Sequence, residues 1–539
     1  MKTVFKLLGI IVVLAGGWVI LQSFNGTKRP AYRFPWRRAG LTERQAAAHL
    51  LSRFTYGAMP GQVDAVVHQG LENWWAEQLA ADLPDDSLAV MLQSYDALEL
   101  TNEQVVNLYP RVGQVARMAI RDGVVNKDSI KTDRKEYREM IRAYMAEKGY
   151  KPEQDLFRQF ICQNILRAAY SNNQLQEVMT DFWFNHFNVS ITKNDCAEFI
   201  PAYERDVIRP NALGKFGDLL LKTAKSPAML FYLDNFSSSA AVDNSAAGEE
   251  GAGAGGADSV VAVRVRQARR SRGLNENYAR EVMELHTLGV EGGYTQEDVT
   301  QAARVLTGWT VYPMNENAQR LIDRFNPDQL ARRGFVHEGD FLFNANRHDK
   351  GEKTVLGHVF PAGGGYEEGV ELLEMLAHHP STARFICRKI AVRFVSDDPP
   401  QSLIDKMAKT FLAKDGDIRQ VLITMVTAPE FWAPAAIREK TKSPFELAIG
   451  AVRSLHAEID QPYPLYTWIT RMGEKKYYYQ APTGFPDRGT YWINAGSLLN
   501  RMNFGLALAE GQIAGVKVEK ADSAEAVGVA IGSPENQLR

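Results

Sequence analysis

Helical spacing of apolar residues, repeated along almost the whole chain, is the feature that most constrains this fold. Thr42 and Gln45 have the pattern of a capping box, and the helix they open would carry Ala46, Leu50 and Phe54 on one side. Strict alternation of apolar and polar residues, which marks a half-buried strand, is scarce. The sequence therefore predicts a mainly α fold: a large multi-helix globular domain with few short strands.

The same spacing predicts further helices, and an apolar stretch at 219–233 is expected to be buried. The further helices are expected at 156–169, 175–187, 295–306, 367–377, 381–395, 403–412, 418–426 and 498–509, and a short strand at 355–360. Hydrophobic residues make up 45% of the 539 residues and charged residues 23%, as in soluble globular proteins. This composition excludes a collagen-like, wholly disordered or polytopic membrane protein.

The N-terminus has the pattern of a secretory signal peptide or a signal anchor. Lys2 and Lys6 precede an uncharged, mostly apolar run at 7–21. As a helix, this run would span about 22 Å, less than the roughly 30 Å of a bilayer core. Basic residues at 28–38 oppose the positive-inside rule. We expect residues 1–30 to be this apolar leader and the body to be exported, either periplasmic or membrane-anchored facing the periplasm; a terminal core helix is the alternative.

One segment, 237–273, differs sharply in composition from the rest. It consists mainly of Ser, Ala, Gly and acidic residues and ends in a stretch with five arginines at 264–272. Too few apolar side chains are present to offset the entropy of ordering, so we expect a flexible insertion. The basic end is either solvated or binds an anionic partner. The insertion divides the helical body into 31–236 and 274–515, and 516–539 is set apart as a C-terminal tail.

Several functional classes have no support in the sequence. The net charge of −2 gives no reason to expect binding to nucleic acid. Three scattered cysteines are too few for a disulfide framework or a closed zinc site. The G-x-S-x-G, H-E-x-x-H, Walker A and C-x-x-C patterns are absent from the sequence. A site therefore has to be sought in polar residues that the fold brings together.

The helix expected at 276–288 is the most informative polar segment. Glu276, Arg280, Glu281 and Glu284 form a continuous polar arc opposite an apolar face. Arg280 is within i±4 reach of Glu276 and Glu284, which is typical of an exposed helix with internal ion pairs. In the functional interpretation, Glu281 is a general base or a metal ligand in a cleft, and Arg280 and Glu276 orient it.

Four further residues are candidates for the same site. His186 lies on an aromatic helix face, as either a core residue or a neutral base or ligand. Asp234 follows the buried stretch. His348 and Asp349 lie in a loop followed by glycine, where they either cap a turn or bind a divalent metal.

Together these segments resemble the bacterial family of unknown function DUF1800. The resemblance rests on residues 48–54, 56–57, 182–187 (F-W-F-N-H-F), 227–229, 233–235, 275–289 (beginning N-E-N-Y-A-R-E), 294–298, 306–309, 348–349 and 482–486. It covers about residues 41–510, with the Gly/Ala-rich insertion where the family has a short link. Phe184 stands where the family often has histidine or another polar residue. The resemblance implies a large, exported, mainly helical protein and assigns no reaction.

Two functional hypotheses follow. The first is an exported hydrolase acting on an envelope or extracellular polymer, with Glu281, Arg280, Glu276, Asp234 and His186 as catalytic residues and His348 and Asp349 as metal ligands. The second is a non-catalytic envelope scaffold or partner-binding protein whose polar cluster is a buried salt-bridge network. Its partners would be an envelope polymer or protein, and the membrane if the leader stays uncleaved. Both require helix packing to bring distant polar segments together.

Overall fold

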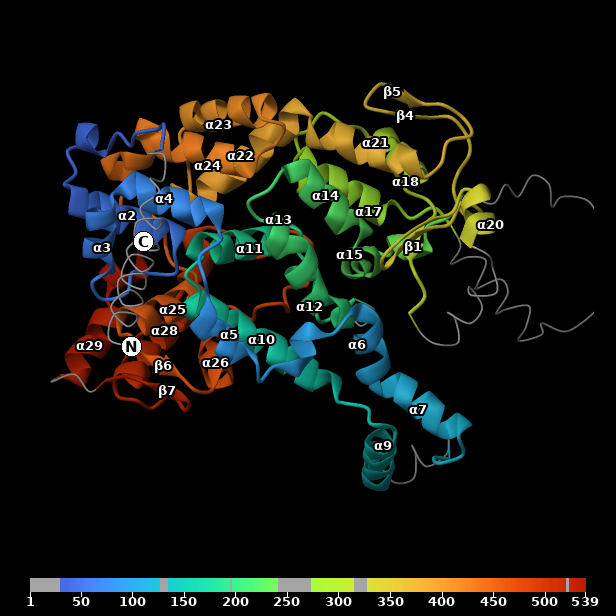
Figure 1. The fold of residues 1–539 in the computed structure, drawn as a ribbon, viewed down its shortest axis with the longest axis horizontal. Coiled ribbons are helices and arrows are strands. Elements are labelled where there is room, and N and C mark those ends of the chain that lie inside the picture. The colour runs from blue at the N-terminus through green and yellow to red at the C-terminus, as the bar shows by residue number, and fades with distance from the viewer. Residues whose placement is uncertain (1–29, 127–133, 194–195, 241–272, 315–326, 520–522) are drawn as a thin grey trace, which may run out of the picture.

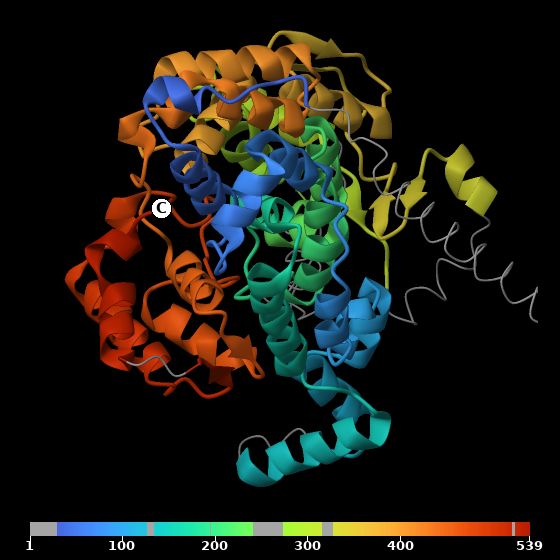
Figure 2. The same cartoon turned by 60° about the vertical axis from the view of Figure 1, so that its left-hand side comes forward.

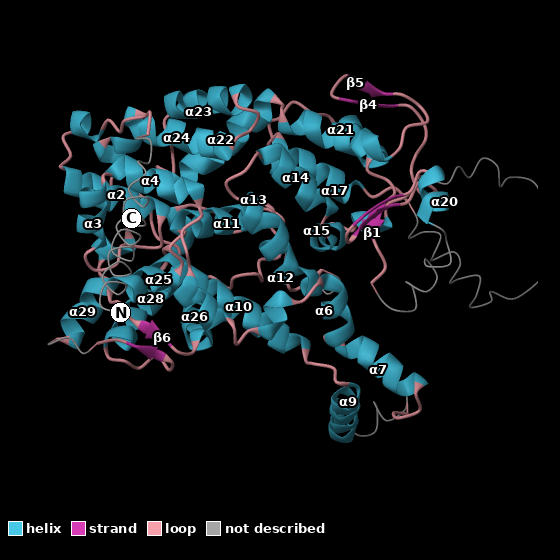
Figure 3. Cartoon of the chain, in the orientation of Figure 1, coloured by secondary structure: helices cyan, strands magenta, loops and turns pink. Residues whose placement is uncertain are grey.

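The structure is a computed structural model that describes residues 30–126, 134–193, 196–240, 273–314, 327–519 and 523–539. Helices dominate it, and the strands form three small antiparallel sheets (Figures 1 and 3). The predicted mainly α fold with few short strands is confirmed. The leader up to residue 29, and most of the insertion with its five arginines, lie outside the described residues. Within the described ranges, no helix is long and apolar enough to cross a bilayer.

Two consecutive helices, α10 (Glu153–Tyr170) and α11 (Gln174–His186), run through the middle of the molecule (Figure 1). Most residues of both helices are buried, including polar ones such as Gln163 and Glu177. A helix buried on nearly all sides has other helices on all sides. These two helices therefore form the axis around which the other helices pack, and both agree with the predicted ranges.

Three groups of helices surround this axis, and one continuous hydrophobic core connects them. The first group contains α2 (Glu43–Phe54), α3 (Gln62–Gln69), α4 (Leu71–Ala80), α22 (Pro380–Phe394), α23 (Gln401–Ala413) and α24 (Ile418–Thr427). The second contains α14 (Phe216–Lys225), α15 (Pro227–Tyr232), α17 (Glu276–Glu281), α18 (Gln296–Val305) and α21 (Tyr366–Ala377). The third contains α25 (Pro444–Ser454), α26 (Pro462–Arg471), α28 (Ala495–Ala509) and α29 (Ala524–Gly532). The predicted capping box of Thr42 and Gln45 is present at the start of α2.

The remaining helices are shorter or project from the body. They are α5 (Asp86–Leu92), α6 (Asn102–Leu108), α7 (Val112–Arg121), α9 (Arg134–Lys148), α12 (Ile200–Ala202), α13 (Arg209–Asn211), α20 (Pro327–Arg332) and α27 (Gly489–Trp492). Helices α7 and α9 extend away from the main core (Figure 2) and have a small hydrophobic core of their own, which includes Val115, Ile141 and Tyr144.

The strands are short and lie in three antiparallel sheets. Their ranges are β1 (Trp309–Val311), β2 (Val336–Glu338) and β3 (Phe341–Phe343), in the order β1-β3-β2; β4 (Lys353–Val355) with β5 (His358–Phe360); and β6 (Glu458–Ile459) with β7 (Val516–Lys517). The single strand predicted at 355–360 was wrong. Leu356 and Gly357 have φ of 51° and 79°, so the chain turns there and forms a β4–β5 hairpin.

The helix expected at 276–288 is not one straight helix. After α17 it continues as a π-helix, η7 (Val282–Thr287), in which the Leu288 amide donates to the Met283 carbonyl at 2.8 Å. The wider turn changes which side chains face inward. Met283 and His286 are buried, whereas Leu285, expected on the apolar face, is only half-buried.

Residues 516–519 and 523–539, from the segment set apart as a tail, pack on the helical body. Helix α29 approaches α28 closely, and a Cβ on Gly505 would lie 2.7 Å from the Gly528 carbonyl oxygen. Arg539 is buried. These residues are therefore part of the fold.

Candidate functional site

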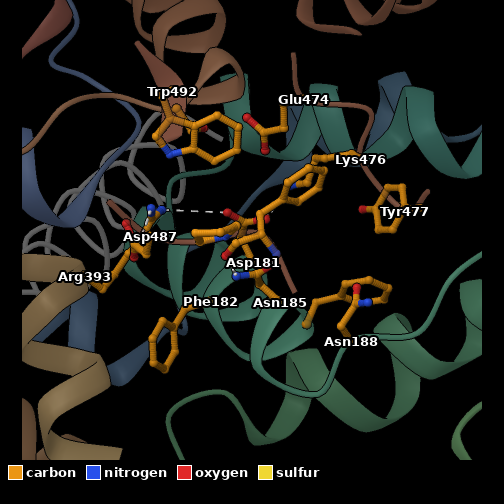
Figure 4. Close-up of a pocket in the computed structure, with 14 residues that line it drawn as sticks. Asp181, Phe182, Asn185, Asn188, Arg393, Glu474, Lys476, Tyr477, Asp487 and Trp492 are labelled. Carbon is orange, nitrogen blue, oxygen red and sulfur yellow. Dashed lines mark hydrogen bonds and ion pairs between the residues drawn. The ribbon is translucent and has the colours of Figure 1, made fainter. Parts of the chain in front are cut away.

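A polar pocket lies where five segments distant in sequence meet: the end of α11, helix α22, the start of α25, the chain after α26, and the loop before α28 (Figure 4). Its lining residues are Asp181, Phe182, Phe184, Asn185, Asn188, Arg393, Ser443, Glu474, Lys476, Tyr477, Phe485, Pro486, Asp487 and Trp492. The cavity is about 50 Å³, which is enough for a few water molecules. Only a small polar group of a ligand therefore fits inside.

Two asparagines near the end of α11 hold the loop that closes the pocket. The Asn185 amide oxygen accepts from the Phe485 N–H at 2.7 Å, and its nitrogen donates to the Phe485 carbonyl at 2.9 Å. Asn188 donates to the Ala481 carbonyl at 2.8 Å. Gly484 has φ of 68°, and a Cβ there would lie 2.1 Å from the Asn185 carbonyl oxygen. Glycine at 484 therefore permits the close approach that positions the loop.

Buried cations fix the carboxylates of this pocket. Lys476 Nζ lies 2.5 Å from Asp181 Oδ1, and Arg393 faces Asp181 at 3.7 Å, as the dashed line in Figure 4 shows. Arg393 also lies 3.8 Å from Asp487, and Lys440 lies 3.6 Å from it. Burial alone would raise the pKa of Asp487, but Arg393, Lys440 and Arg539 outweigh burial and lower it. Asp487 is therefore held as a carboxylate.

Arg393 extends this arrangement into a second layer. It pairs with Glu446 of α25 at 2.7 Å, and Glu446 pairs with Arg539 at 3.1 Å. Arg539 in turn donates to the Arg393 carbonyl at 3.0 Å. We call Asp181, Arg393, Lys440, Glu446, Lys476, Asp487 and Arg539 the Arg393 network. It connects α11, α22, α25 and the chain just before it, the chain after α26, the pocket loop and the C-terminal segment.

Glu474 differs from the other acids of the pocket. Its side chain is buried, and burial raises its pKa to about 7, with Asp181 adding to the effect. Lys476 and the Phe445 N–H, which donates to Glu474 Oε2 at 2.8 Å, act in the opposite direction. A carboxyl group that gains and loses its proton near neutral pH, inside a pocket, has the properties of a general acid or base.

The residues predicted from the acid-rich helix lie elsewhere, on the outer side of α17. Arg280 is 3.5 Å from Glu276, and both side chains are more than a third exposed. Glu276 also accepts from Thr300 Oγ1 at 2.7 Å and from Gln296 Nε2 at 2.9 Å. For Glu276 and Arg280, the geometry is that of an exposed helix with local pairs.

Glu281 is half-buried on the same helix. Burial and the neighbouring Glu284 raise its pKa, and Arg280 opposes them. Glu284 accepts from the Tyr294 hydroxyl at 3.0 Å. Burial is the main cause of the raised pKa of Tyr232, and Glu281 contributes to it, so these two groups are within electrostatic range. Glu281 does not line the polar pocket, and its catalytic role stays a prediction.

Asp234 lies beside the start of the acid-rich helix. The Asn275 side chain, which caps α17, donates to the Asp234 carbonyl at 2.9 Å. The Asp234 carboxylate pairs with Lys193 at 2.7 Å, and both side chains are about a third to a half exposed. Helix packing thus brings these two polar segments together as expected, but at the surface.

His186 lies in the aromatic core. It is 2% exposed, its Nε2 lies 3.1 Å from the His286 carbonyl oxygen, and the two imidazole rings are 6.1 Å apart. Burial is the main cause that lowers the pKa of both histidines, so both are neutral at pH 7. The His186 segment therefore adjoins the end of the acid-rich helix, and its histidine is buried among aromatic rings.

The side chains of His348 and Asp349 interact with different partners. His348 Nε2 lies 3.2 Å from Glu368, which also pairs with the buried Lys353 at 2.6 Å. Asp349 receives two bonds from Arg304, at 2.9 and 3.0 Å, and also accepts from the Gly351 N–H. The turn-capping interpretation describes Asp349.

The described ranges contain no group of three or more His, Cys, Asp and Glu residues arranged to hold a metal ion. The three cysteines are buried and free. The metal-ligand roles of His348 and Asp349 stay a prediction.

Sequence reasoning missed Glu474, Lys476, Arg393 and Asp181. Asp181 and Arg393 are single charged residues within predicted helices, and Glu474 and Lys476 lie in a stretch for which no helix or strand was predicted. Such residues have the pattern of ordinary surface positions. The available signal was the proline- and glycine-containing segment 482–486, which was noted and is followed by Asp487. Asn185 and Asn188, which hold this loop, also line the pocket.

The fold and the pocket define a class: a mainly helical protein built around a buried charge network, with a small polar cavity at its edge. The family described as "protein of unknown function (DUF1800)" matches residues 49–536, and the chain belongs to this family. The resemblance stated from the motifs is thereby confirmed. Comparison with curated proteins and with solved structures gives no match. Because the family description names no activity, the function has to be derived from the site.

Proposed function

We propose that this DUF1800 protein is a hydrolase that acts on an envelope or extracellular polymer and uses Glu474 as its acid–base group. The observation that carries the proposal is the pairing of two different carboxyl groups in one cavity. Glu474 has its pKa raised to about 7, and the carboxylate of Asp181 is held by two cations. Acid–base pairs in enzymes commonly consist of two carboxyl groups in different surroundings, one of which has a raised pKa.

The chemistry that suits this pair is cleavage of a glycosidic bond. Glu474 donates its proton to the leaving oxygen as the carbon–oxygen bond breaks, and it regains a proton from the water that adds to the carbon. Asp181 places a negative charge beside the positive charge that develops on the sugar ring. Lys476 and Arg393 keep Asp181 in position throughout.

The size of the cavity favours a substrate whose bulk lies outside the pocket. Phe485, Tyr491 and Trp492 form an aromatic rim, with ring centroids 5.6 Å apart for Phe485 and Trp492 and 4.8 Å apart for Tyr491 and Trp492. Tyr491 is the exposed member of this rim, because Trp492 is buried and Phe485 is half-buried. Aromatic faces offer rigid apolar contact area. A long polymer with one bond at the pocket and its chain over the rim fits this arrangement.

Export is part of the proposal, and the leader sequence supports it. The apolar run at 7–21 behind two lysines is the pattern of an export signal or a signal anchor. A substrate in the envelope or outside the cell is consistent with that location.

The test is hydrolysis of a panel of dye-labelled polysaccharides by the purified full-length chain and by Glu474→Gln. Loss of a general acid costs about 10²–10⁴-fold in rate. Glu510→Gln, at the exposed end of α28, is the matched control and should keep the wild-type rate. Equal rates for Glu474→Gln and wild type would refute the assignment. If Glu281→Gln alone abolishes activity, the site is at α17, as first hypothesised.

A second candidate, a non-catalytic scaffold, is favoured by the Arg393 network itself. Its buried charges are paired across six segments, which is what a purely structural network requires. For a scaffold, the folded wild-type protein would hydrolyse none of the polymers in the panel.

A further inference from the structure

Large apolar side chains are exposed together at the start of α28 and just before it. The exposed fractions are 41% for Tyr491, 38% for Ile493, 39% for Leu498, 60% for Leu499 and 49% for Met502. We call these five residues the apolar face. Leu498, Leu499 and Met502 share one side of α28, because residues three or four positions apart are neighbours on a helix. A cluster of this kind on a surface indicates an interaction site.

The apolar face carries no exposed charge. From Gly489 to Ala509 the one charged residue is Arg501, which is buried and donates to Gln537 at 2.8 Å. Exposed surfaces of soluble domains normally mix charges of both signs among their apolar residues. A surface free of charge over 21 consecutive residues is therefore suited to an uncharged, apolar environment.

Three exposed cations belong to the segments next to this face. Arg471 ends α26, and its carbonyl accepts from Asn500 of α28 at 2.9 Å, which places it beside the face. Lys475 lies four residues after Arg471, and Arg488 directly precedes α27. Among the described residues none of these three cations has a carboxylate partner; Arg471 and Lys475 lie over the rings of Trp468 and Tyr478. They are available to an anionic partner.

We propose that the apolar face is a docking surface for an anionic lipid bilayer. Its side chains would enter the interfacial layer, and Arg471, Lys475 and Arg488 would meet the lipid phosphates. Apolar residues with a basic surround are the pattern of proteins that lie on such membranes. The inference does not depend on the hydrolase proposal.

The chain before the described residues favours a bilayer over a soluble partner. The apolar run at 7–21 has the pattern of a signal anchor, and the eight residues at 22–29 reach at most about 29 Å when extended. A body anchored by this run stays beside the bilayer. Tyr491 of the apolar face also contacts Trp492, which lines the polar pocket, so docking would place the pocket at the membrane surface.

Thiol labelling tests the proposal, because the three native cysteines are buried. Leu499→Cys in the full-length chain would carry an environment-sensitive dye, with Val359→Cys on β5, 49% exposed, as the matched control. Both would be mixed with vesicles of phosphatidylglycerol and phosphatidylcholine. We expect the dye at 499 to lose quenching by aqueous iodide and gain quenching by spin-labelled acyl chains, and the dye at 359 to show neither change.

A charge-reversal variant shows whether the cations take part. Arg471→Glu, Lys475→Glu and Arg488→Glu together should restore iodide quenching at 499, because each cation near an anionic surface contributes several-fold to binding. Unchanged iodide quenching at 499 in the presence of vesicles would overturn the proposal. A second result would also overturn it: the dye at 499 is protected from iodide without vesicles, and light scattering shows the protein to be dimeric. The apolar face would then be a protein interface.

Discussion

The outer side of α17 and the Arg393 network use the same kinds of residue in opposite ways. Glu276 on α17 accepts a hydrogen bond from Thr300, which is only 24 residues away, and its ion pair with Arg280 is partly exposed. In the network, Asp181 pairs with Lys476, 295 residues away, and both are largely buried. Local sequence pattern therefore reveals the first region and not the second. The two regions should also differ in their contribution to the free energy of unfolding. Exposed ion pairs contribute little to it, whereas breaking a buried pair lowers it strongly.

The largest expected effect is on the network. Arg393→Met removes one cation from the buried Glu446 and from the half-buried Asp487, and breaking a buried pair costs about 3–5 kcal/mol of the free energy of unfolding. Arg280→Met removes one exposed pair and should cost less than about 1 kcal/mol. Chemical denaturation of both variants measures the difference. Similar losses for the two would show that the regions are energetically alike.

The pH dependence of stability tests Glu474. Its folded pKa of about 7 lies above the ordinary 4.5, so the folded state holds a proton that the unfolded state has released. The contribution of Glu474 to stability is therefore greatest below pH 4.5 and is lost as pH rises towards 7, by on the order of 3 kcal/mol.

Glu474→Gln removes this dependence, so its stability relative to wild type should rise between pH 5 and 8. Thermal unfolding of both proteins across that range measures it. Glu510→Gln, the exposed control, should follow wild type at every pH. If the stability of Glu474→Gln depends on pH in the same way as that of the wild type, the raised pKa of Glu474 is contradicted.

A substitution in the pocket loop should lower the free energy of unfolding by an intermediate amount. Gly484→Ala and Gly40→Ala both place a side chain at positive φ, but only Gly484 has a neighbouring backbone oxygen in the way. Overpacking costs roughly 1–3 kcal/mol, so Gly484→Ala should be less stable than Gly40→Ala by that amount. Equal unfolding free energies would mean that Asn185 does not confine the loop.

The smallest effect is expected for Glu276→Gln on α17. Gln296 is exposed, the Arg280 side chain is more than a third exposed and Thr300 is half-buried, so the unfolding free energy should change by less than about 0.5 kcal/mol, and added salt should reduce even that change. Urea denaturation at low and high salt measures it. A loss above about 2 kcal/mol would place Glu276 among the buried network residues in energetic terms.

Sequence was sufficient where structure is determined locally. The capping boxes of Thr42 and Thr295 and the helices they start follow from residues three positions apart. It was insufficient where geometry depends on the fold. The hairpin at Leu356 requires a left-handed backbone at a leucine, and the π-helix after Glu281 leaves no mark in apolar spacing.

The candidate site shows the same division. Helix packing brings the acid-rich helix beside the Asp234 corner, as the sequence hypothesis required, and the contact is a hydrogen bond from the Asn275 cap, which was not predicted. It did not find Glu474, because the raised pKa of that residue comes from burial and from Asp181, neither of which is encoded near position 474.

The most direct test of these conclusions is a pH titration of Glu474 by ¹³C NMR of the full-length protein labelled at glutamate carboxyl carbons. The signal absent from Glu474→Gln identifies the residue. We predict a titration midpoint near pH 7 in the folded protein. A midpoint near the ordinary 4.5 would show that the pocket holds no proton at neutral pH and would contradict the assignment of Glu474 as the acid–base group.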